Sequence, residues 1–170
     1  MKSNLTNNKK GFTLIELLVV LLIIGLLATI SVVALGTARA KGRDTRRLTD
    51  IKGIQNALEL YFIDKNGYPD DKVAGLGSSP TIGTVGGAYA RLDDSGWSAL
   101  ADTDTPVYIV KAPLNPTPNG ANYVYTSTDS AGLTCDASPC ATYTLTFNLE
   151  SGAGGYAAGA RTATPPDVVQ

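Results

Sequence analysis

The hydrophobic and polar positions divide the first 65 residues into three stretches. A polar stretch, 1–11, precedes an apolar run, 12–35, in which Glu16 is the only charged residue. Farther along, apolar residues recur at steps of three and four, with polar residues between them, at Leu48, Ile51, Ile54, Leu58, Tyr61 and Phe62. This spacing predicts an amphipathic helix that continues the apolar run, so we expect one helix from about 13 to 65. Gly67, in a left-handed cap, and the nearby Pro69 should end it.

Strand-like segments follow at 107–110, 122–126 and 141–149, and the last alternates apolar and polar residues most regularly. A final edge strand over 155–161 is a further option. The glycine-rich stretch before these segments predicts a loop over 66–105 with a short helix near 96–101. The expected fold class is therefore α+β, in which a long N-terminal helix, half transmembrane and half amphipathic, packs on a small C-terminal antiparallel β-sheet at about 106–161.

The composition argues against several classes of function. The chain has no histidine and a formal net charge of −1, so it lacks the commonest general base and metal ligand and has no general attraction for nucleic acid. No phosphate-binding loop, nucleophile elbow or metal-ligand spacing is present, so we predict no catalytic, cofactor or metal residues. Cys135 and Cys140, without histidine, predict a disulfide and an oxidising compartment.

The apolar run is long enough to cross a membrane. Its 24 residues would form a helix of roughly 36 Å, against a hydrocarbon core of about 30 Å. A secretory signal peptide, with Ala38-Arg39-Ala40 as its cleavage site, would normally have a shorter apolar region. A plain transmembrane anchor accounts for the length but leaves the abrupt boundary at Gly11 and Phe12 unexplained.

The boundary resembles a known processing signal. Lys9-Lys10-Gly11 followed by Phe12-Thr13-Leu14-Ile15-Glu16 resembles the leader of type IV pilins and type II secretion pseudopilins. The resemblance implies cleavage between Gly11 and Phe12 by prepilin peptidase and N-methylation of Phe12. It also implies three parts, namely a leader at 1–11, a transmembrane and filament-core helix at 12–36, and a soluble head at 37–170.

The resemblance makes Glu16 the fifth residue of the mature chain, where the family places a glutamate. A carboxylate inside a membrane is costly and calls for a partner. Cleavage would create one nearby cation, the amine of Phe12, and in a filament this amine would pair with Glu16 of another subunit. Glu16 is therefore predicted to be an assembly contact. The family often has a proline in the stretch that corresponds to 31–35, and this chain has none there.

The expected function is that of a structural subunit of a pilus-like or pseudopilus filament. Its expected partners are identical or homologous subunits, prepilin peptidase, an assembly platform and, before assembly, membrane lipid. The alternative is a membrane-anchored binding domain or enzyme that uses the segment only as an anchor. The expected location is the inner membrane, with a cytoplasmic N-terminus and an external head, followed by the filament, although the cations after the span make the positive-inside rule ambiguous.

Two further features leave alternatives open. The mixed charges from Arg39 to Asp50 suit either an assembly surface or a solvated helix face. Major type II pseudopilins hold calcium in a C-terminal loop, where this chain offers Asp129, Asp136 and Glu150 without an evident cluster of oxygen ligands. Calcium is therefore left unassigned.

Overall fold

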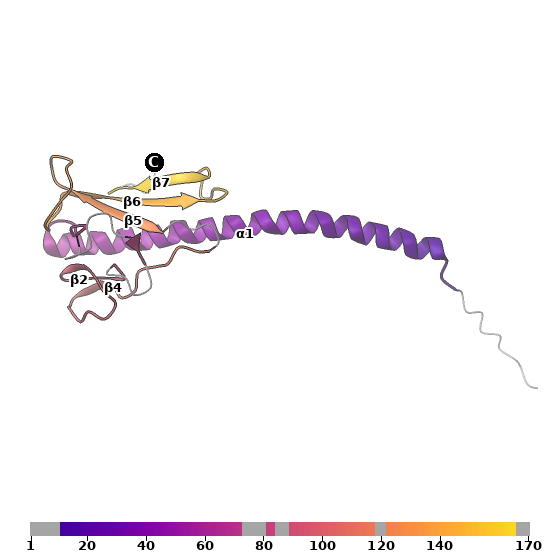
Figure 1. The fold of residues 1–170 in the computed structure, drawn as a ribbon, viewed down its shortest axis with the longest axis horizontal. Coiled ribbons are helices and arrows are strands. Elements are labelled where there is room, and N and C mark those ends of the chain that lie inside the picture. The colour runs from indigo at the N-terminus through magenta and orange to yellow at the C-terminus, as the bar shows by residue number, and fades with distance from the viewer. Residues whose placement is uncertain (1–10, 73–80, 84–88, 118–121, 166–170) are drawn as a thin grey trace, which may run out of the picture. The chain divides into compact units, whose positions relative to one another are not determined.

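The computed structural model describes residues 11–72, 81–83, 89–117 and 122–165. The chain forms two compact units, Met1–Arg39 and Ala40–Gln170, and the described part of the second is called the head below. The helix α1, Leu14–Lys65, belongs to both (Figure 1). Its bounds confirm the helix predicted from about 13 to 65.

The N-terminal unit is an exposed apolar helix. Every described residue from 11 to 39 is exposed. Among the described residues, α1 is the one helix long and apolar enough to cross a membrane, with a mean hydropathy of 3.0 in its most apolar window. The hydroxyls of Thr29, Ser31 and Thr37 donate to carbonyls three or four residues earlier, so these polar groups are satisfied within the helix. The helix is unbroken through 31–36.

The end of α1 differs from the sequence prediction in one residue. Asn66 rather than Gly67 takes the left-handed conformation, with φ 56°, and its amide donates to the carbonyl of Phe62. Asparagine tolerates this conformation better than most residues do. Gly67 is needed for a different reason, because a Cβ atom there would lie 2.3 Å from the Cβ of Pro139.

Gly67→Ala is therefore expected to destabilise the head by about 1–3 kcal/mol, since the loop around Pro139 would have to move. Gly53→Ala is the matched control, because a Cβ at this exposed helical position meets nothing within 4 Å. The control should be neutral or slightly stabilising. Urea unfolding of the full chain in detergent, followed by the fluorescence of Trp97, measures both effects, and equal midpoints for the two variants would refute the close contact.

One antiparallel sheet of four strands covers one side of the helix in the head (Figure 1). Its strands are β1 (Thr81–Ile82), β5 (Tyr123–Thr128), β6 (Thr142–Leu149) and β7 (Gly159–Ala163), in the order β1-β5-β6-β7. The long strands confirm the predictions at 122–126 and 141–149. The edge strand considered at 155–161 is present as β7, which begins four residues later.

A second sheet lies on the other side of the helix (Figure 1). It consists of β2 (Arg91–Asp93), β3 (Gly96–Ser98) and β4 (Val107–Ile109), in the order β3-β2-β4. The α+β class is confirmed, but the head has two antiparallel sheets where one was expected, and the stretch expected to be a loop contains β2 and β3. The short helix expected near 96–101 is wrong, because β3 lies there. Gly96, with φ 104°, and the bond from the amide of Ser95 to the carboxylate of Asp93 make a hairpin turn there.

Both sheets share one hydrophobic core with α1. The predicted stripe is confirmed, since Leu48, Ile51, Ile54, Leu58 and Tyr61 are buried and Phe62 packs against them. Opposite the stripe, β5 and β6 bury Tyr123, Tyr125, Tyr143, Leu145, Phe147 and Leu149. Burial of the two faces against each other is the main stabilising contribution to the head.

Candidate functional site

The residues assigned to processing lie together at the start of the N-terminal unit. Gly11 and Phe12 precede α1 in an exposed segment that is neither helix nor strand, and 83% of Phe12 is accessible to solvent. The helix begins two residues after Phe12. The peptide bond between Gly11 and Phe12 is therefore outside regular secondary structure, which is the condition that a peptidase needs to reach a backbone.

Glu16 forms local contacts that the sequence analysis did not consider. Its carboxylate accepts hydrogen bonds from the backbone N–H of Thr13, at 3.2 Å, and from the Thr13 hydroxyl, at 3.0 Å. In return, the amide of Glu16 donates to the Thr13 hydroxyl at 3.4 Å. This reciprocal arrangement is a capping box, which satisfies donors at the start of a helix. Glu16 thus has a structural role within one chain, and any role between chains must be separated from it by experiment.

The head contains a buried ionic cluster that ties α1 to the loop after β6. The carboxylate of Asp44 accepts the backbone amides of Glu150, Ser151 and Gly152 at 2.8–2.9 Å. It also pairs with Arg47, whose guanidinium lies 2.6 Å away, and both side chains are fully buried. Burial alone would raise the pKa of Asp44, but the hydrogen bonds outweigh it and the pKa lies below its ordinary value.

Arg47 extends this cluster to a third segment of the head. Its guanidinium donates to the side-chain oxygen of Asn115 at 2.7 Å and to the carbonyl of Pro116 at 2.8 Å, and it pairs with Glu150 at 2.5 Å. Arg43 also binds Glu150, through two nitrogens. The hydrogen bond from Arg43 is the largest of the effects that lower the pKa of Glu150 to about 2.

The ionic cluster predicts acid sensitivity of the head. Because folding lowers the pKa values of Asp44 and Glu150, their stabilisation is present above the ordinary carboxyl range. For Glu150 it should be lost as the pH falls from 4.5 towards about 2. The urea midpoint of the full chain in detergent, reported by Trp97, should therefore fall over this range. Glu150→Gln should flatten the dependence, and an unchanged pH profile in this variant would contradict the assignment.

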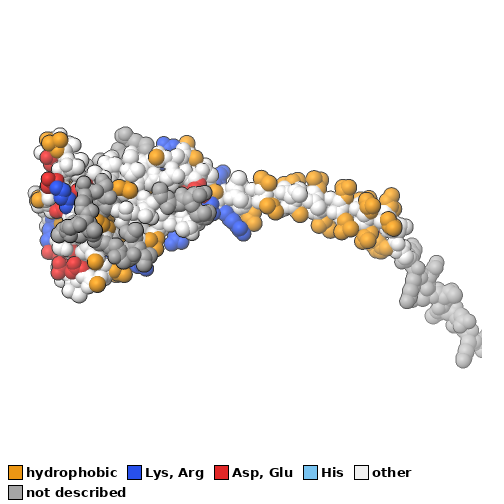
Figure 2. Space-filling view, in the orientation of Figure 1, with side chains coloured by type: hydrophobic (Ala, Val, Ile, Leu, Met, Phe, Trp, Pro, Cys, Tyr) orange, Lys and Arg blue, Asp and Glu red, His pale blue; other side chains and the backbone are white. Residues whose placement is uncertain are grey.

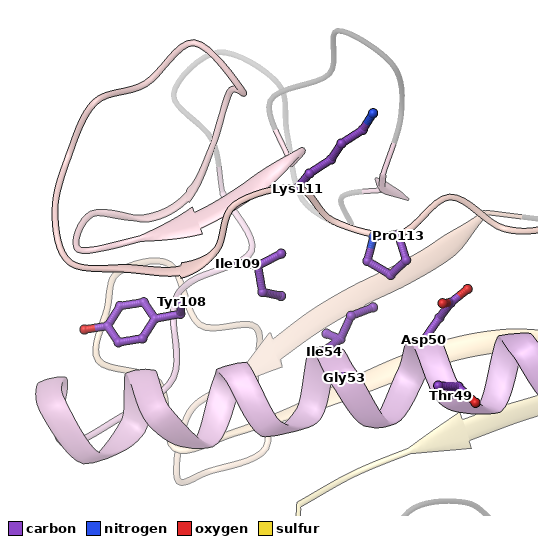
Figure 3. Close-up of a pocket in the computed structure, with 8 residues that line it drawn as sticks. All are labelled: Thr49, Asp50, Gly53, Ile54, Tyr108, Ile109, Lys111 and Pro113. Carbon is purple, nitrogen blue, oxygen red and sulfur yellow. The ribbon is translucent and has the colours of Figure 1, made fainter.

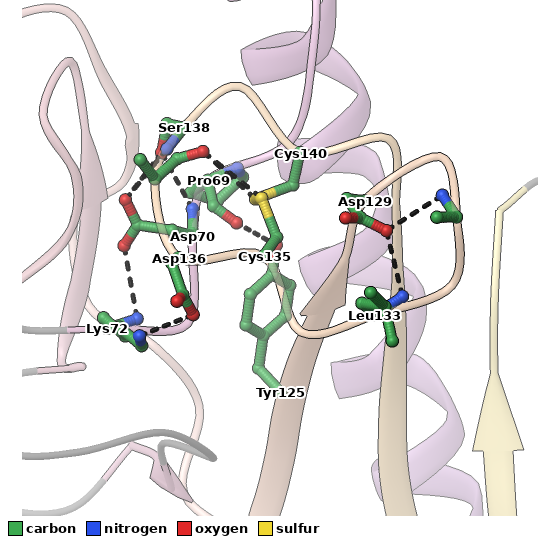
Figure 4. The surroundings of a disulfide bond; sticks show 12 residues. Pro69, Asp70, Lys72, Tyr125, Asp129, Leu133, Cys135, Asp136, Ser138 and Cys140 are labelled. Atoms are coloured by element: carbon green, nitrogen blue, oxygen red, sulfur yellow. Dashed lines mark hydrogen bonds and ion pairs between the residues drawn. A yellow bond between two sulfur atoms is a disulfide. The ribbon is translucent and has the colours of Figure 1, made fainter.

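The predicted disulfide is present between Cys135 and Cys140, in the loop that joins β5 to β6 (Figure 4). Backbone bonds between Tyr68 and Cys140, at 2.8 and 2.9 Å, attach this loop to the segment that follows α1. The hydroxyl of Ser138 donates to Asp70 at 3.0 Å, beside these bonds. The disulfide therefore stabilises the loop that fastens the end of the helix to the sheet.

The acidic residues considered for calcium are separated and already have partners. Asp129 accepts the amides of Ala131 and Leu133 within its own turn (Figure 4), and Asp136 pairs with Lys72. Glu150 belongs to the ionic cluster with Arg43 and Arg47. Within the described ranges, no group of three or more His, Cys, Asp or Glu side chains could hold a metal ion. Asp129, Asp136 and Glu150 therefore do not form one shared ligand set.

A surface cavity of about 270 Å³ lies between α1 and the end of β4 (Figure 3). Its lining residues are Thr49, Asp50, Gly53, Ile54, Tyr108, Ile109, Lys111 and Pro113. The carboxylate of Asp50 accepts the Tyr123 hydroxyl at 3.0 Å, and burial raises the pKa of Asp50. The lining contains no nucleophile held beside a base, so this cavity offers no catalytic arrangement.

Sequence reasoning missed two features of this site. The capping box was readable, since Thr13 and Glu16 have the Ser/Thr-x-x-Glu spacing before an apolar run. The burial of Asp44 and Arg47 was not readable, because charges three residues apart on a helix are usually solvated. The two alternatives for the charges from Arg39 to Asp50, an assembly surface or a solvated helix face, therefore omitted a third, because Asp44 and Arg47 lie in the interior of the head.

Comparison with known proteins places these features in context. Residues 6–32 match the family described as the prokaryotic N-terminal methylation motif. The chain is 33% identical to the type II secretion system core protein G of Aeromonas hydrophila over 97 residues, which cover 52% of this chain and 68% of that protein. It is 34% identical to the core protein G of Escherichia coli (strain K12) over 88 residues, which cover 51% and 61% respectively.

A pilus component is also similar to this chain. The type IV wide pilus major component PilA4 of Thermus thermophilus is 40% identical over 77 residues, which cover 43% of this chain and 59% of that protein. The matches with these three relatives thus span between 59% and 68% of their lengths. No solved structure matches the chain.

Proposed function

Because the chain belongs to the family of type IV pilins and type II secretion pseudopilins, we propose that it is a structural subunit of a filament. The filament is a type IV pilus-like fibre or a type II secretion pseudopilus, and its other subunits are identical or homologous chains. The observation that carries the proposal is the Gly11-Phe12 boundary at the start of an exposed apolar helix, inside the matched methylation motif.

Processing converts the precursor into the subunit. Prepilin peptidase cuts between Gly11 and Phe12, and the new amino group of Phe12 is methylated. The exposed backbone at this boundary, which lies outside helix and strand, supports the assignment. The disulfide and the resemblance of the leader together favour a cytoplasmic N-terminus and a head outside the inner membrane.

Assembly buries the apolar helix of one copy against those of others. Large side chains from 12 to 35 are 47–83% exposed in the isolated chain, which is a surface that requires lipid before assembly and neighbouring helices afterwards. Glu16 pairs with the Phe12 amine of a neighbouring subunit, and an assembly platform extracts the subunit from the membrane. Catalysis has no part in this role.

The proposal is tested by isolating filaments from cells that express the chain with a small tag on its C-terminus. Filaments should be sheared or extracted and examined by electron microscopy with a label against the tag. The proposed function requires the chain to repeat along the fibre. A chain that stays monomeric in the membrane fraction while fibres form from other subunits would support the alternative of an anchored binding domain.

A further inference from the structure

The two ends of the head carry opposite charges. At the end where α1 enters the head, Lys41 and Arg46 are exposed, and neither forms an ion pair within the described residues. Their neighbours Arg43 and Arg47 are already paired with Asp44 and Glu150. Arg46 lies within electrostatic range of the half-buried Asp50, on the next turn of the helix. The exposed charge at this end is positive.

The opposite end of the head is acidic. Asp64, in the last turn of α1, is exposed and accepts the Tyr108 hydroxyl at 2.8 Å. Asp94 reaches Lys65 at 2.5 Å, which places the turn after β2 at the same end. The guanidinium of Arg91 donates to the backbone carbonyls of Asp102 and Asp104, which places this acidic segment at the same end. Asp104 is exposed. Figure 2 shows acidic side chains at this end of the head, with basic side chains among them.

The distance between the basic and acidic ends of the head, and the shared orientation of the copies, decide which charged side chains can interact. At about 1.5 Å per residue, α1 separates Lys41 from Asp64 by roughly 35 Å, several Debye lengths at physiological salt. The two ends of one head therefore hardly interact with each other. If all copies leave the same membrane in the same orientation, however, the basic end of one head faces the acidic end of the next.

We propose that Lys41 and Arg46 of one copy bind the acidic end of a second copy, around Asp64 and Asp104, as a head-to-tail contact along the filament. This inference rests on the proposed function and names the surface that heads use in it. A phospholipid headgroup could also attract the basic end, but lipid would leave the acidic end without a counterpart. A second copy supplies a partner for the basic end and for the acidic end at once. If a neighbouring head were inverted, ends of like charge would meet and repel each other.

Charge reversal at each end, and then at both, tests the contact in full-length chains expressed in cells. Lys41→Glu with Arg46→Glu should lower filament yield about tenfold, and Asp64→Lys with Asp104→Lys should do the same. The four substitutions together should restore most of the yield, because the attraction is re-formed with its signs exchanged. Lys52→Glu with Lys111→Glu, which makes the same charge change at exposed sites away from the ends, should leave the yield near that of the parent.

The outcomes separate the contact from the function on which it rests. Normal filaments from either reversed end, or no recovery in the fourfold variant, would overturn the contact while the proposed function stands. A third outcome is that only the variant reversed at the basic end loses filaments, and that its full chain also binds more weakly to vesicles containing anionic phospholipid. This result would assign the basic end to lipid and would also overturn the contact. A parental chain that forms no filaments would overturn both proposals.

Discussion

Replacing Asp44 by alanine is expected to lower the free energy of unfolding of the head by about 3–5 kcal/mol. The substitution leaves the guanidinium of Arg47 in the interior without one of its two carboxylate partners. It also removes the acceptor of three backbone amides in the loop after β6. Unpaired groups of this kind cost far more when buried than the original hydrogen bonds contribute. The effect is therefore a large part of the stability of a typical domain.

The measurement is urea unfolding of the full chain in detergent. The chain has one tryptophan, Trp97, which is buried in the head, so its fluorescence reports the head alone. Thr45→Ala is the control, because Thr45 is the exposed neighbour of Asp44 on the same helix and should change stability by no more than about 0.5 kcal/mol. Similar midpoints for Asp44→Ala and the control would show that the ionic cluster contributes little.

Replacing Glu16 by glutamine is expected to lower the yield of filaments at least about tenfold, while the chain still inserts and is processed. Glutamine can take the place of glutamate in a capping box, so this variant keeps the local contacts with Thr13 and loses only the charge. The Phe12 amine of the neighbouring subunit would then have no counter-charge in an environment of low dielectric constant. Filament yield and the processed fraction are measured on the same cells.

Two companion variants identify the contact that matters. Glu16→Ala removes both the charge and the cap, and it should be no better than Glu16→Gln. Thr13→Ala removes the hydroxyl of the capping box and keeps the charge, so it should assemble nearly as the parent does. If Glu16→Gln assembles normally and Glu16→Ala does not, then Glu16 serves the start of its own helix rather than contact with another subunit.

The sequence predicted elements whose side chains follow a regular period. The stripe from Leu48 to Phe62 and the alternation in β6 are repeated patterns, and each extends over enough residues to identify a face. The strands β2 and β3 have three residues each, which is too short for a period to emerge from a glycine-rich stretch. They pair with each other as a tight hairpin, and β4 pairs with the other edge of β2.

The interior charges were unpredictable for a related reason. Nothing in the spacing of Asp44 and Arg47 distinguishes a solvated pair from a buried one. Their burial depends on Glu150 and Asn115, which lie far along the chain and contact them only in the folded head. The pairing of Cys135 with Cys140 was easier, because these are the two cysteines of the chain and they lie five residues apart. The boundary at Gly11 and Phe12 stays a prediction from the local sequence.

The most direct test of the account is the intact mass and N-terminal sequence of the chain recovered from purified filaments. We expect a chain that begins at Phe12, carries a methyl group on its amino nitrogen and retains the Cys135–Cys140 disulfide. A filament chain that still begins at Met1, or one that begins at Lys41 after removal of the whole apolar segment, would contradict processing and assembly through this helix.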